Sequence, residues 1–156
     1  FNMIRLIVTH YFGKDNVVIT GSPDEAIELS NKGFIVVCKY HPFHKRLFVL
    51  SDYIFTTTRN MDEIKESMLR FYGVDNMPKR NILLMKKHSL QWQEASFNQT
   101  FDSIVSNPLL CIKEIIGYIG IESDFSEQIL EQFKSIKPPS KGYDKNTFLF
   151  SNHITK

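Results

Sequence analysis

The sequence predicts a single α/β domain in which helices flank a central, mainly parallel sheet. Three observations lead to this expectation. Short β-branched runs alternate with amphipathic stretches, the most apolar run (residues 34–38) contains no polar residue, and Gly or Pro residues separate successive elements. A strand that is apolar at every position is typical of a sheet covered on both faces.

Composition limits the classes of function. The 156 residues suffice for one domain with a core, and 42% hydrophobic against 23% charged residues is ordinary for a globular protein. A dispersed net charge of +2 argues against a nucleic-acid partner, whereas an anionic small molecule needs only a local group of donors. The isolated Cys38 and Cys111 suit a reducing compartment, so a cytoplasmic location is expected. No apolar run in the sequence reaches the length of a membrane span.

The first part of the chain predicts helix, strand, helix and strand. Residues 1–12 form the first expected helix, which Gly13 can end, because apolar side chains share one face: Ile4, Ile7, Val8 and Tyr11. The β-branched run 17–20 predicts a short strand. Ser22, Pro23 and Glu25 then give a helix-start signal with Gly33 as the stop, and the apolar strand 34–38 follows.

The second part continues the alternation. Residues 53–58 predict a strand and residues 62–72 a helix. Residues 82–95 fit a strand or a helix, and the stripe through Trp92 favours a helix whose tryptophan belongs to the core; a short strand is expected near 97–101. Asn107 and Pro108 open a further helix, in which Ile112, Ile115, Ile116 and Ile119 line one side. Residues 126–136 predict another helix, which Pro138 ends.

Polar side chains follow two of the predicted strands. Lys39 and His41 come directly after the strand 34–38, and Arg59 comes directly after the strand 53–58, with Ser67 on the next helix. Ligands of open α/β sheets bind at the carboxyl ends of the strands. These four residues are therefore the candidate site.

The same residues carry a resemblance to PAPS-dependent sulfotransferases, where PAPS is 3′-phosphoadenosine 5′-phosphosulfate. The family signature R-[ND]-P-x-[DE]-x-x-x-S is similar to residues 59–67, with Met61 in place of the proline. Residues 101–108 resemble the family's Y-E-D-L-x-x-N-P segment, and residues 118–121 resemble its F-L-G-I. The resemblance covers nearly the whole chain and implies a three-layer, P-loop-like fold.

The resemblance also implies roles for individual residues. Arg59 and Ser67 would bind the 3′-phosphate of PAPS, and Phe101 would lie near the adenine, where it lacks the hydroxyl of the usual tyrosine. His41 would act as general base toward a hydroxyl or amine acceptor, on a small molecule or a glycan. Lys39 would neutralise charge on the transferring group, and no metal would be required.

Two family motifs have no counterpart in the chain. A loop resembling P-K-S-G-[ST]-T-W would be expected just upstream of residue 1, and a loop resembling R-K-G-x-x-G-D-W just after residue 156. We therefore expect a sulfotransferase-like domain that lacks its first strand, its phosphate-binding loop and its C-terminal glycine loop. Such a piece should bind PAPS poorly.

Interpretations other than sulfuryl transfer also stay open, both for single residues and for the whole chain. Arg59 fits a surface ion pair, and Lys39 and His41 fit a solvated basic turn with His44, Lys45 and Arg46. A metal site at Cys38, His41 and His44 is rejected, because the spacing matches no zinc pattern and a fourth ligand is lacking. For the whole chain, the alternatives are a degenerate sulfotransferase-like module that only binds a ligand or protein, and a P-loop kinase that uses Mg²⁺.

Overall fold

The computed structural model describes residues 1–40, 43–60, 62–64, 66, 79–93 and 96–136. Residues 62–64 and 66 are helical. The elements, in chain order, are α1 (Asn2–Phe12), the 3₁₀ turn η1 (Lys14–Asn16), β1 (Val17–Thr20), α2 (Pro23–Asn31), β2 (Ile35–Cys38), α3 (Lys45–Leu50), β3 (Phe55–Thr58), α5 (Lys79–Gln93), β4 (Phe97–Thr100), α6 (Phe101–Ser106), α7 (Pro108–Ile119) and α8 (Ser126–Ser135).

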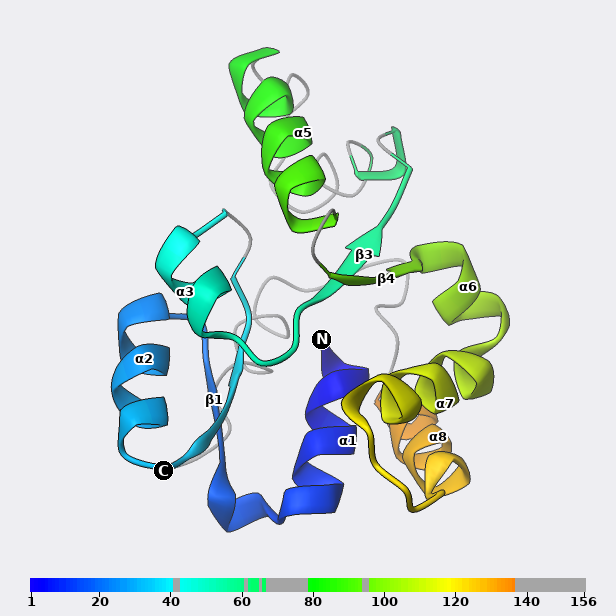
Figure 1. Ribbon diagram of the computed structural model, residues 1–156. Coiled ribbons are helices and arrows are strands. Elements are labelled where there is room, and N and C mark those ends of the chain that lie inside the picture. Colours follow the sequence, from blue (N-terminus) through cyan, green and yellow to red (C-terminus); the bar gives the residue numbers. More distant parts are fainter. Residues whose placement is uncertain (41–42, 61, 65, 67–78, 94–95, 137–156) are drawn as a thin grey trace.

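The described strands form two separate parallel pairs (Figure 1). Val17 of β1 pairs with Ile35 of β2, and Phe55 of β3 pairs with Phe97 of β4. The mixed α/β class and the parallel pairing agree with the sequence. Among the described residues the two pairs are not joined into one central sheet, so the three-layer arrangement stays a prediction.

Most of the helix boundaries follow the sequence signals. Ser22 Oγ accepts a hydrogen bond from Glu25 N at 3.4 Å, which caps α2, and Asn107 Oδ1 accepts one from Leu110 N at 3.3 Å, which caps α7. Gly13 follows α1 with φ of +85°, and Gly120 follows α7 with φ of +79°. Both conformations are costly for residues that carry a Cβ, so glycine is the natural terminator here.

The main hydrophobic core lies where α1, α7 and α8 pack together (Figure 1). Ile7, Ile112 and Ile129 are completely buried, one on each helix. Three isoleucines on one face of α7 agree with the predicted stripe: Ile112, Ile115 and Ile116 are all buried. The strongest apolar packing in the described chain is therefore helix on helix.

The strand β2 is less covered than its sequence predicts. Within β2 only Val37 is buried, and Phe34, expected as the first residue of the strand, precedes it and is 40% exposed. Helices α1 and α2 both pack against the β1–β2 pair, but a sheet of two strands is too narrow to be enclosed on every side. The expectation of burial on both faces is therefore only partly met.

Aromatic contacts connect the β3–β4 pair to helix α7 of the hydrophobic core. The Tyr118 ring of α7 stacks on Phe97 of β4 at 4.8 Å between centroids and meets Phe55 of β3 edge-on at 5.3 Å. Such pairs stabilise beyond the area they bury. This contact fixes the β3–β4 pair, whose carboxyl ends carry the candidate site.

A second aromatic contact involves α3, which the sequence did not predict, and α5, which it did. The Trp92 ring lies 5.0 Å from Phe43 and 6.1 Å from Phe48, measured between centroids. Trp92 thus packs against Phe48 of α3 and against Phe43, which lies two residues before that helix. Among the described helices, none combines the length and apolar character that a membrane span requires.

Candidate functional site

Candidate residues lie at the carboxyl ends of parallel strands, as the sequence indicates. Lys39 directly follows β2, Arg59 directly follows β3, and Phe101 directly follows β4 as the first residue of α6. His41 and Ser67 lie outside the described residues. The geometry of the site is therefore that of Arg59, Phe101 and their neighbours.

Arg59 and Phe101 are in direct contact. The Arg59 guanidinium carbon lies 4.2 Å from the centroid of the Phe101 ring, which is a cation–π arrangement. The strand register explains the contact, because Thr58 of β3 pairs with Thr100 of β4 and thereby places the next residue of each chain segment side by side. Two residues that are distant in sequence are thus brought together by one strand pair.

Glu63 is the acidic partner of Arg59. Arg59 Nε donates a hydrogen bond to Glu63 Oε2 at 2.9 Å, and the two side chains are 34% and 44% exposed. Four residues separate them, which is the spacing of one helical turn. Arg59 therefore forms the surface ion pair that was considered as an alternative to ligand binding. Its guanidinium also contacts the Phe101 ring.

Local capping bonds hold the backbone around this group. Asn60 Oδ1 accepts a hydrogen bond from Asp62 N at 2.9 Å, at the start of the helical residues 62–64. Thr100 Oγ1 accepts one from Ser103 N at 3.0 Å and caps α6. Side-chain oxygens that satisfy the first amides of a helix fix where that helix begins. Arg59 precedes the first of these helical segments, and Phe101 is the first residue of the second, α6. The starts of both segments are therefore fixed by capping bonds.

Lys39 occupies a different part of the site. Its ammonium lies 5.4 Å from the centroid of the Phe1 ring, at the amino end of α1, and its backbone N donates to Thr20 O at 2.9 Å. Within the described residues no hydrogen bond, ion pair or ring contact joins Lys39 to Arg59 or Phe101. The structure thus unites two of the candidates and leaves Lys39 apart from them.

Cys38, beside Lys39, has the properties of a structural thiol. Burial, followed by the nearby Glu25 carboxylate, raises the pKa of the Cys38 thiol above its ordinary value of 9.0. A thiol of this kind stays protonated near neutral pH, and the thiolate is the reactive form. This environment suits a structural role for the Cys38 thiol.

Sequence reasoning missed two features near the site. Glu63 was not assigned a role, although its spacing from Arg59 on a predicted helix is a recognised signal for an ion pair. His44 was grouped with the basic turn, but its Nδ1 accepts a hydrogen bond from Leu47 N at 3.2 Å and caps α3. His44 therefore serves as the cap of this helix.

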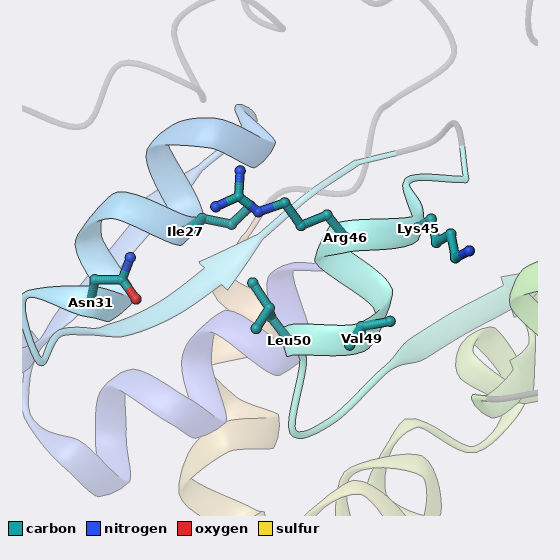
Figure 2. Close-up of a pocket in the computed structure, with 6 residues that line it drawn as sticks. All are labelled: Ile27, Asn31, Lys45, Arg46, Val49 and Leu50. Carbon is teal, nitrogen blue, oxygen red and sulfur yellow. The ribbon is translucent and has the colours of Figure 1, made fainter.

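One cavity among the described residues lies away from these candidates. It is an open groove of about 590 Å³ between α2 and α3, lined by Ile27, Asn31, Lys45, Arg46, Val49 and Leu50. Figure 2 shows Arg46 extending across it from α3 toward Ile27 of α2. A much smaller cavity of about 30 Å³ lies beside the candidate site, where Phe1 meets Phe55 and Thr57 of β3.

Comparison with known proteins adds no relative. No family model matches the chain, and neither the curated proteins nor the solved structures gave a match.

Proposed function

We propose that this chain is a sulfotransferase-like domain that moves a sulfuryl group from PAPS to a hydroxyl or amine acceptor. One observation carries the proposal. Arg59 directly follows strand β3 and contacts Phe101, the first residue of helix α6 after strand β4. Both residues lie at the carboxyl edge of the parallel strands, where α/β proteins bind ligands. The motif resemblance of residues 59–67 and 101–108 supplies the identity of that ligand.

The chemistry of the site suits a phosphorylated donor. The planar guanidinium of Arg59 offers a fork of donors that matches a phosphate, and Ser67 would add a hydroxyl. In the transfer step, the acceptor oxygen attacks sulfur while the bond from sulfur to the bridging phosphate oxygen breaks. His41 takes the acceptor proton, Lys39 offsets charge on the sulfuryl oxygens, and the product PAP (3′-phosphoadenosine 5′-phosphate) leaves.

The pairing of the described strands β2 and β3 is compatible with the expected additional strand. Lys39 N and Phe97 N donate into their own strand pairs, at 2.9 Å and 2.8 Å. Because backbone amides alternate in direction, those of Val36 and Cys38 in β2, and of Phe55 and Thr57 in β3, point away from their partners. In Figure 1 both strands run toward the top of the view and the amino end of α1 lies between the sheets.

The test is PAP binding by the full-length protein, measured by calorimetry. Arg59→Ala removes a charged hydrogen-bond donor and should weaken PAP binding by about 10- to 100-fold. Lys134→Ala is the matched control, because it also deletes one cation of an exposed ion pair, here with Glu131 on α8. Equal affinities for Arg59→Ala and the wild type would rule out the phosphate role.

A second variant separates transfer from binding. His41→Ala should abolish sulfuryl transfer and leave PAP affinity largely intact. PAP binding with no transfer by the wild type would instead indicate the degenerate binding module, and Mg²⁺-dependent ATP turnover would indicate the kinase.

A further inference from the structure

The guanidinium of Arg59 is held from two directions. Glu63 Oε2 accepts the Nε proton at 2.9 Å, and the guanidinium carbon lies over the Phe101 ring, 4.2 Å from its centroid. In the part of the chain that the structure describes, no residue takes a hydrogen bond from Nη1 or Nη2. Among the described residues, the edge with the two Nη donors therefore has no protein acceptor.

The backbone sets both of these contacts independently. The pairing of Thr58 with Thr100, together with the Thr100 cap of α6, fixes where Phe101 begins its helix. Asn60 caps the helical turn on the other side, which puts Glu63 one turn beyond Arg59. Neither contact depends on a bound ligand, so the arginine is oriented in advance.

We propose that Phe101 and Glu63 are positioning residues that present the Nη edge of Arg59 to the 3′-phosphate of the donor. This inference rests on the proposed function and changes one role within it. Since the guanidinium covers one face of the Phe101 ring, the ring acts on the ligand through Arg59 rather than by stacking on the adenine. Preorganisation of this kind lowers the entropy lost when the phosphate binds.

The experiment is a double-mutant cycle on Arg59 and Phe101, with PAP affinity of the full-length protein measured by calorimetry. Phe101→Leu keeps an apolar side chain and removes the π face, so it should weaken PAP binding by roughly 3- to 30-fold. In the Arg59→Ala background the same substitution should change affinity less than about 2-fold, because the cation is gone. Equal losses in both backgrounds would overturn the proposal in favour of adenine stacking.

A second ligand separates the two roles of the ring. Adenosine 5′-monophosphate contains the adenine and lacks the 3′-phosphate, so Phe101→Leu should leave its affinity unchanged. A loss for this nucleotide as large as the loss for PAP would contradict the proposal. Phe101→Tyr keeps the ring face and should restore the PAP affinity of the wild type, which excludes a fold defect as the cause.

Glu63 is tested by a conservative pair. Glu63→Gln keeps an oxygen acceptor for Nε and removes a negative charge near the phosphate, so it should bind PAP at least as tightly as the wild type. Glu63→Ala loses the acceptor and should bind more weakly than Glu63→Gln. Identical affinities of the two variants would refute the positioning role of Glu63. An unchanged affinity in Arg59→Ala alone would defeat the proposed function itself, which distinguishes the two failures.

Discussion

Asp124 shows how one exposed carboxylate organises the beginning of a helix. Its Oδ1 accepts hydrogen bonds from Ser126 Oγ at 2.6 Å and Ser126 N at 3.0 Å, at the first residue of α8. These two bonds, and more weakly the charge of Lys113, lower the pKa of Asp124 below its ordinary value of 3.8. The ionised carboxylate is therefore the form that the fold favours.

This pKa shift predicts a pH dependence of stability. Asp124→Asn keeps an oxygen acceptor and removes the charge, so it should lower the urea midpoint at pH 7. A carboxylate whose folded pKa is depressed stabilises above its unfolded pKa, and this contribution is lost as the pH falls through the folded value. The gap between variant and wild type should thus close in acid below the ordinary range of an aspartate. A gap that stays constant in a pH series of urea titrations would contradict this assignment.

Single residues of the site differ in how far the sequence predicts them. Arg59 is predictable, because a charged residue directly after an apolar strand lies at the ligand-binding edge of the sheet. Its contact with Phe101 depends on the register of β3 and β4, which pair across a long stretch of chain. Local patterns do not determine such a register. The contact therefore became visible only in three dimensions.

At the scale of an element, α7 provides a matched pair of glycines. Gly117 lies within the helix and Gly120 follows it with φ of +79°, and a Cβ added at either position would meet no atom within 4 Å. The two positions therefore do not differ in the space available for a Cβ. They differ in backbone conformation, because only Gly120 has a positive φ.

We predict opposite effects of the same substitution at these two positions. Gly117→Ala should stabilise the protein by about 0.5–1 kcal/mol, because alanine restricts the unfolded chain and favours helix. Gly120→Ala should destabilise it by about 1–2 kcal/mol, because the left-handed conformation is costly for an L-residue with a Cβ. Free energies from urea unfolding test both variants, and effects of the same sign would contradict the assigned role of Gly120.

Two helices with standard start signals were predicted, whereas α3, which lacks such signals, was missed. The helices α2 and α7 begin with Ser22 and Asn107, each followed by proline, and both were expected from the sequence. Helix α3 has six residues, two cations in its first turn and a histidine as its cap. Cations are disfavoured at that end of a helix and histidine is an uncommon cap, so no local pattern indicated it.

At the scale of the whole molecule, stability should depend most on the α1–α7–α8 core. Ile112 is completely buried there, while Leu110 on the same helix is 50% exposed. Ile112→Ala should reduce the free energy of unfolding by about 2–5 kcal/mol through lost burial and an internal cavity. Leu110→Ala should change it by less than about 0.5 kcal/mol. Comparable losses in a denaturant titration would show that the core lies elsewhere.

The arrangement of the strands is the part of the fold that the sequence predicts least. Alternation of elements indicates an α/β class and parallel pairing, and both are found. Strands of four residues carry little information about which neighbours they choose. The buried face of a helix, in contrast, is predicted by a periodic stripe of apolar residues. Such a stripe predicted the buried face of α7 correctly.

The position of Trp92 determines what an optical measurement on this protein reports. Trp92 is the only tryptophan in the sequence, and in the described part of the chain its indole contacts the rings of Phe43 and Phe48. Intrinsic tryptophan emission therefore follows the docking of α5 on α3, whereas far-ultraviolet circular dichroism averages over all helices. Loss of the first signal before the second would mark the α3–α5 contact as a separate cooperative unit.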